Sequence, residues 1–123
     1  MDNRKKIVLV ADDDVDLLQL VKMQLQNAGF IVELSLNGIG ITKMITETHP
    51  DVILLDITMD GISGGDICRK LKSNNATSAI PIIMLSANEN IEQVVHSCGA
   101  NDFVRKPFSL QAMKEKILDV VRA

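Results

Sequence analysis

Aromatic residues are scarce in this chain. Phenylalanine occurs three times, as Phe30, Phe103 and Phe108, and there is no tryptophan or tyrosine, so aromatics make up 2% of the 123 residues. Hydrophobic residues still account for 46%, a fraction that is ordinary for a globular protein. The core must therefore be aliphatic, and the length suits one domain that buries about two thirds of the unfolded chain's surface.

Other features are also missing. Two cysteines, Cys68 and Cys98, lack metal-ligand spacing, so we expect them reduced and packed, with a disulfide or a redox pair as the alternative. No apolar stretch approaches the ~20 residues of a membrane span, and the N-terminus lacks a signal peptide's apolar region, so we expect a soluble, cytoplasmic protein with no membrane partner. The net charge of −3 argues against nucleic acid as the direct partner.

Short apolar runs alternate with amphipathic stretches five times along the chain. The runs predict five strands, over Lys6–Ala11, Phe30–Ser35, Val52–Asp56, Pro81–Ser86 and Asp102–Lys106. Unbroken apolar runs are typical of strands covered on both faces, and strict alternation with helices predicts a doubly wound parallel sheet with right-handed crossovers. This α/β pattern extends from residue 6 to residue 121, and we expect no second domain.

Capping residues predict where several helices begin and end. The expected signals are Gly29 and Gly99 as C-terminal stops, Asn37 and Ser109 as N-caps, and Ser63 with Asp66 as a capping box.

Polar side chains stand at the ends of four of the predicted strands. Asp12 and Asp13 follow the first, Asp56 ends the third, Ser86 ends the fourth and Lys106 ends the fifth. Ligands of such sheets bind beyond the carboxyl ends of the strands. A carboxylate can accept a phosphoryl group, a hard cation held by oxygen ligands can neutralise the charge, and a hydroxyl and an ammonium group can bind phosphoryl oxygens.

Several polar residues near these strand ends, and the two histidines, have simpler explanations. Acids after a strand often only favour a helix N-terminus, and we interpret Asp14 and Asp16 in that way. Asp12, Asp14 and Asp16 imitate the start of a calcium-binding EF-hand loop, but Leu17 replaces its glycine and Met23 its final glutamate. His49 and His96 are expected to be surface residues.

Four motifs in the right order and at the right separations carry a resemblance to a known family. They are Leu9-Val-Ala-Asp12-Asp13, Leu54-Leu-Asp56-Ile-Thr58-Met59, Met84-Leu-Ser86-Ala87 and Lys106-Pro107-Phe108. The chain resembles a receiver (response-regulator) domain of two-component signalling, and is similar in extent to the single-domain chemotaxis-type members. The resemblance implies the flavodoxin-like (βα)5 fold, with five parallel strands in the order 2-1-3-4-5.

The resemblance also implies roles for the strand-end residues. Asp56 would accept the phosphoryl group. Asp12, Asp13, Asp56 and the backbone carbonyl of Thr58 would bind Mg²⁺, with Mn²⁺ as a possible substitute. Ser86 and Lys106 would contact the phosphoryl group, Lys106–Pro107 would be a cis peptide, and Phe103 would be the aromatic that moves with Ser86.

The implied function is a switch driven by phosphorylation. A sensor histidine kinase or a histidine phosphotransfer protein would be the donor, the receiver itself would catalyse transfer and autodephosphorylation, and an unknown target protein would read the result. Two other functions stay open: a degenerate receiver that only binds protein, and an aspartate-nucleophile phosphatase. The chain departs from the family pattern at Met59-Asp60, where the family has Met-Pro, and we expect a looser loop there.

Overall fold

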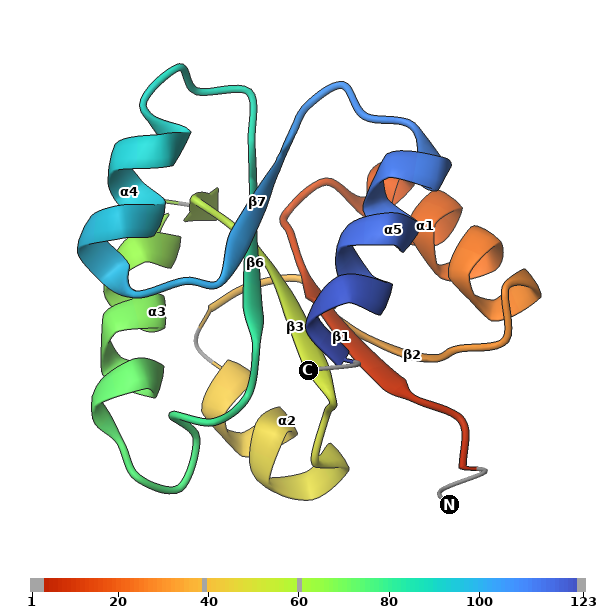
Figure 1. Cartoon of the computed structure of the whole chain (residues 1–123), viewed down its shortest axis with the longest axis horizontal. Coiled ribbons are helices and arrows are strands. Elements are labelled where there is room, and N and C mark those ends of the chain that lie inside the picture. Colours follow the sequence, from red (N-terminus) through yellow and green to blue (C-terminus); the bar gives the residue numbers. More distant parts are fainter. Residues whose placement is uncertain (1–3, 39, 60, 122–123) are drawn as a thin grey trace.

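A five-stranded parallel sheet forms the centre of the molecule in the computed structural model, which describes residues 4–38, 40–59 and 61–121 (Figure 1). Its strands are β1 (Ile7–Ala11), β2 (Ile31–Ser35), β3 (Val52–Asp56), β6 (Ile82–Ser86) and β7 (Asp102–Arg105). They lie in the order β2-β1-β3-β6-β7. Because β6 and β7 are the fourth and fifth strands of this sheet, the order is 2-1-3-4-5, and the predicted flavodoxin-like fold is confirmed.

In the part of the chain that the structure describes, five helices cover the two faces of the sheet. They are α1 (Val15–Asn27), α2 (Ile41–Thr48), α3 (Gly64–Ser73), α4 (Ile91–Cys98) and α5 (Leu110–Val121). Helices α1 and α5 pack on one face, and α2, α3 and α4 pack on the other (Figure 1). Among the described residues, none of the helices is long and apolar enough to cross a membrane.

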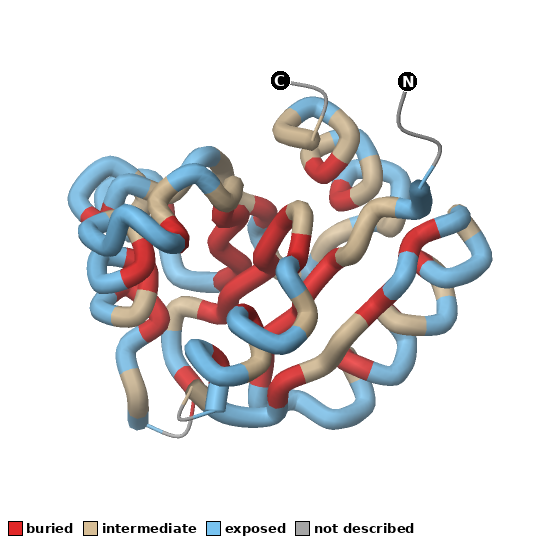
Figure 2. The backbone as a smooth tube through the Cα atoms, turned by 90° about the horizontal axis from the view of Figure 1, so that it is seen from below, coloured by how far each residue is buried: buried red, intermediate tan, exposed pale blue. Residues whose placement is uncertain are grey.

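Alternating side chains of the strands divide the core into two clusters. In β1, Val8 and Val10 face α1 and α5, whereas Leu9 and Ala11 face the other three helices. All five residues of β3 and of β6 are buried, as expected of strands covered on both faces. Buried segments run through the middle of the molecule, and exposed ones lie mostly at its periphery (Figure 2). The second cluster contains both cysteines as buried, free thiols, as predicted.

Most of the predicted caps are present. Asp14, Ser63 and Ser109 accept hydrogen bonds from the backbone N–H groups three residues further on, at the starts of α1, α3 and α5. Gly29 and Gly99 have φ values of 99° and 82°, which favour glycine after a helix.

The prediction of Asn37 as the cap of α2 is wrong. The helix begins at Ile41 after Gly40, and it has no side-chain cap. The Ser35 hydroxyl donates instead to the Asn37 backbone carbonyl over 2.6 Å. Asn37 is therefore part of the turn that precedes α2, which begins four residues later at Ile41.

A small antiparallel hairpin after β3 was not predicted. It pairs β4 (Thr58–Met59) with β5 (Ile62–Ser63), and Met59 is fully buried. Asp60, where the family pattern has proline, lies outside the described residues, so the expected looseness of this loop stays a prediction.

Candidate functional site

The parallel pairing of β1 and β3 places the strand-end acids side by side. Ala11 pairs with Leu55, so Asp12 and Asp56 emerge from neighbouring strands at the same edge. Asp12, Asp13 and Asp56 each offer a carboxylate oxygen, and these oxygens all lie within 4.8 Å of one another. Three oxygen donors at this spacing fit a hard divalent cation, which would relieve their mutual repulsion.

Asp12 and Asp13 differ in their surroundings. Asp12 is completely buried, and both of its carboxylate oxygens accept hydrogen bonds, one from the Asp14 backbone N–H over 3.0 Å and one from the Lys106 ammonium group over 2.7 Å. Asp13 is exposed. The carboxylate of Asp12 is therefore held in place within the protein, whereas Asp13 is open to solvent.

Lys106 joins the two buried acids from the end of β7. Its backbone N–H donates to the Ser86 carbonyl, and the Lys106–Pro107 peptide is cis, as predicted. Its Nζ lies 2.7 Å from Asp12 Oδ2 and 3.7 Å from Asp56 Oδ2. Burial alone would lower the pKa of Lys106, but its hydrogen bond to Asp12 and the surrounding carboxylates raise it. The ammonium group therefore stays charged at neutral pH.

Asp56 is a buried carboxylate whose pKa lies above its ordinary value. Burial, together with the charges of Asp12 and Asp13, raises the pKa of Asp56 to about 6, although Lys106 and a hydrogen bond from the Thr58 backbone N–H oppose the shift. Lys106 thus offsets only part of the repulsion between the carboxylates. Thr58 itself is exposed at the start of the hairpin, and its predicted use of the backbone carbonyl for metal binding stays a prediction.

Ser86 and Phe103 lie on the same face of the sheet. Ser86 ends β6 next to β3, and its Oγ accepts a hydrogen bond from the Asn88 backbone N–H over 2.8 Å. Phe103, on β7, pairs with Met84, two residues before the Arg105–Ser86 pair. Side chains two apart on a strand share a face, so the Phe103 ring and the Ser86 hydroxyl both lie on the face that carries α4.

Sequence reasoning missed the role of Gly64. Its N–H donates to the Ile57 carbonyl, and a Cβ atom at this position would overlap the backbone carbonyl oxygen of Asp56. The start of α3 therefore lies directly against the backbone that carries Asp56. The available signal was the Gly64-Gly65 pair in the first turn of a helix, where glycine is a poor helix former and usually needs a packing reason.

The two adjacent glycines predict opposite effects of alanine. Gly64→Ala is expected to lower the unfolding free energy by about 1–3 kcal/mol and to displace Asp56, because backbone atoms block the new methyl group. Gly65→Ala is the matched control: its Cβ would lie 3.4 Å from Val94 Cγ1, an ordinary contact, and alanine should stabilise the helix by about 0.5–1 kcal/mol. Urea unfolding measures both, and equal stability of the two variants would contradict the close approach.

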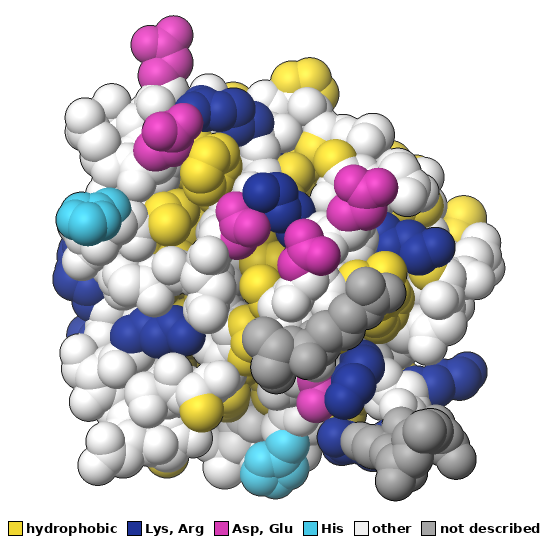
Figure 3. All heavy atoms as spheres, in the orientation of Figure 1, with side chains coloured by type: hydrophobic (Ala, Val, Ile, Leu, Met, Phe, Trp, Pro, Cys, Tyr) yellow, Lys and Arg dark blue, Asp and Glu magenta, His cyan; other side chains and the backbone are white. Residues whose placement is uncertain are grey.

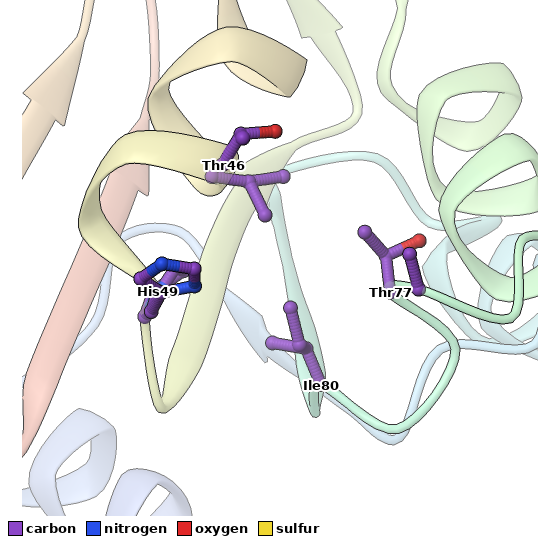
Figure 4. Close-up of a pocket in the computed structure, with 7 residues that line it drawn as sticks. Thr46, His49, Thr77 and Ile80 are labelled. Carbon is purple, nitrogen blue, oxygen red and sulfur yellow. The ribbon is translucent and has the colours of Figure 1, made fainter.

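A cavity of about 320 Å³ lies at the opposite ends of β3 and β6 (Figure 4). Its lining consists of Ile45, Thr46, His49, Pro50, Ala76, Thr77 and Ile80. The hydroxyl groups of Thr46 and Thr77 donate to the backbone carbonyls of Thr42 and Leu71. Among the described residues, the cavity is lined by no carboxylate and no lysine, in contrast to the other edge of the sheet. His49 and His96 are both exposed, as predicted.

Comparison with known proteins agrees with this geometry. The family profile described as response regulator receiver domain matches residues 8–118. The chain is 30% identical over 117 residues to the DNA-binding dual master transcriptional regulator RpaA of a Synechocystis species, and 34% identical over 119 residues to the DNA-binding response regulator MtrA of Mycolicibacterium smegmatis. These matches cover 94% and 95% of this chain but 48% and 51% of those proteins, so the chain spans about half the length of these relatives.

Solved structures give the same result. The chain superposes on the chemotaxis protein CheY4 of Vibrio cholerae with a TM-score of 0.87 at 25% identity, over 95% of this chain and 99% of that one. A response regulator receiver domain from Bermanella marisrubri gives a TM-score of 0.87 at 28% identity, over 96% and 99% of the two chains. With the family profile matching nearly the whole sequence, the chain belongs to the response regulator receiver domain family of two-component signalling.

Proposed function

We propose that the chain is a phosphorylation-activated switch in which Asp56 accepts the phosphoryl group. The observation that supports this most is the placement of Asp56: it is buried beside two further carboxylates and 3.7 Å from the Lys106 ammonium group. A carboxylate in this setting can form an acyl phosphate. The donor would be a phosphohistidine on a sensor histidine kinase or a phosphotransfer protein.

The chain's residues would divide the chemistry among themselves. A carboxylate oxygen of Asp56 attacks phosphorus in line, the bond from phosphorus to the imidazole nitrogen of the donor breaks, and the imidazole leaves. Asp12, Asp13 and Asp56 would hold Mg²⁺, which when bound would neutralise phosphoryl charge. Lys106, held by Asp12, would place its ammonium group against a phosphoryl oxygen, and the Ser86 hydroxyl would donate to another.

The same site would also reset the switch. Water attacks the acyl phosphate and releases inorganic phosphate, so the chain would catalyse both its own phosphorylation and its dephosphorylation. Movement of Ser86 toward the phosphoryl group would draw Phe103 after it and change the face formed by α4, β7 and α5. Phosphorylation acts only to the extent that it favours one of the two arrangements. Another domain or protein would read that face.

A labelling experiment tests the proposal. Acetyl phosphate with Mg²⁺ is expected to add one phosphoryl mass, labile to hydroxylamine as an acyl phosphate is, and peptide mapping should place it on Asp56. Excess chelator is the control and should prevent labelling, since the acids then repel the incoming anion. A receiver that serves only to bind protein would stay unlabelled, and a phosphatase would release phosphate from many phosphomonoesters.

A further inference from the structure

Two cations lie close to the Phe103 ring at the edge of the sheet. The Arg105 guanidinium is 5.4 Å and the Lys116 ammonium 5.8 Å from the centre of the ring, both within the range of a cation–π interaction. Arg105 comes from β7 itself and Lys116 from α5. The ring is only partly buried and packs against the core cluster under α4.

Each cation is in turn fixed by an acid. Arg105 pairs with Glu92 of α4 over 2.9 Å, and Lys116 pairs with Asp102 over 3.0 Å. On this side of the molecule, basic and acidic side chains alternate with hydrophobic surface between them (Figure 3). The two ion pairs therefore link α4, β7 and α5 around a single aromatic ring.

We propose that Arg105 and Lys116 form a clamp that holds the Phe103 ring in the position seen here. The clamp lowers the population of the arrangement in which the ring has moved inward, and so opposes the change that phosphorylation favours. The inference rests on the proposed function, in which Phe103 moves inward when Ser86 turns to a phosphoryl group. In this structure Ser86 Oγ is bonded to the Asn88 N–H. The side chains of Arg105 and Lys116 are 47% and 41% exposed at the edge of the sheet. A ring that moves inward therefore moves away from both cations.

The clamp predicts a measurable shift in the position of the ring. A cation–π contact at an exposed site is worth about a two- to fivefold change in population. Arg105→Gln and Lys116→Gln should each shift the ring inward by about that factor and speed labelling by acetyl phosphate to the same extent. Arg105→Lys and Lys116→Arg keep the positive charge, so the ring position and the labelling rate should stay close to those of the parent.

Fluorine NMR of the chain carrying 4-fluorophenylalanine can follow the ring directly. Phe103→Leu identifies its signal among the three phenylalanines, and the difference between H₂O and D₂O reports the exposure of the ring. Glu92→Gln breaks an ion pair but leaves Arg105 over the ring, and Lys70→Gln removes a distant charge, so neither should match the effect of Arg105→Gln.

Two results would overturn the clamp. One is that the exposure of the ring is unchanged in both Arg105→Gln and Lys116→Gln. The other is that these substitutions change the labelling rate by the same factor in a Phe103→Leu background as in the parent, because the effect would then not pass through the ring. Failure of the proposed function looks different, because the parent itself would then not be labelled. The ring measurement needs no phosphoryl group, so it decides whether the cations hold the ring in either case.

Discussion

Replacing Asp56 by asparagine is expected to abolish phosphoryl acceptance and, in the presence of chelator, to stabilise the fold. The amide cannot form an acyl phosphate, so labelling by acetyl phosphate should fall to background. The gain in stability follows from the charge that is removed: a carboxylate buried beside Asp12 and Asp13 is destabilising when it is ionised.

The stabilisation should depend on pH in a defined direction. The pKa of Asp56 is raised to about 6 in the folded chain, above its value in the unfolded chain, so the folded chain binds the proton more tightly. The stability that the protonated form provides is present at pH 4 and is lost as the pH rises through about 6. At pH 7.5 Asp56 is ionised in both states, and the full loss of unfolding free energy is reached. A pKa shift of this size corresponds to a loss of about 1–3 kcal/mol.

Urea unfolding of parent and variant at several pH values, with chelator, measures this effect. Asp56→Asn should exceed the parent in stability at pH 7.5, and the difference should shrink toward zero near pH 4. Asp119→Asn removes the same charge from an exposed position on α5 and controls for net charge. A variant that is less stable than the parent at pH 7.5 would show that Asp56 is better stabilised by Lys106 than its position implies.

Much of the fold could be predicted because the local apolar pattern and the burial of each segment in the tertiary structure agree. Fully buried strands need unbroken apolar runs, which is why Val52–Asp56 matches β3 exactly in extent and the other strands differ by one residue at an end. The gathering of Asp12, Asp13 and Asp56 also follows from topology, since the carboxyl ends of neighbouring parallel strands share one edge. Their individual roles in transfer stay predictions.

The remaining features depend on contacts that local patterns do not encode. The hairpin Thr58–Met59/Ile62–Ser63 has strands of two residues, too short for a period to be recognised. Glycine is needed at position 64 because the backbone of Asp56 lies against it. The sequence around Gly64 signals only the start of a helix and carries no information about this contact. The clamp around Phe103 depends on the rotamers of side chains from β7 and α5, so no spacing within the sequence could reveal it.

Asp13→Asn is expected to remove most of the affinity for Mg²⁺. Mg²⁺ binds proteins through one or two carboxylates and several waters, so the loss of one charged ligand should weaken binding by about tenfold or more. Asp14→Asn is the matched control: it removes the same charge one residue away, and asparagine can still cap α1 as Asp14 does. Calorimetric titration measures both, and equal affinities would remove Asp13 from the metal site.

The same variant should have the opposite effect on the fold when the cation is chelated. Removing one of three carboxylates within 4.8 Å of one another relieves repulsion, so Asp13→Asn is expected to raise the unfolding free energy by about 1 kcal/mol. The gain in melting temperature on adding Mg²⁺ should be smaller than in the parent, because a ligand stabilises the folded state only in proportion to its binding. A melting temperature of Asp13→Asn below that of the parent in chelator would show that the three acids do not repel one another as their spacing implies. The argument for a cation-binding cluster at this edge of the sheet would then be wrong.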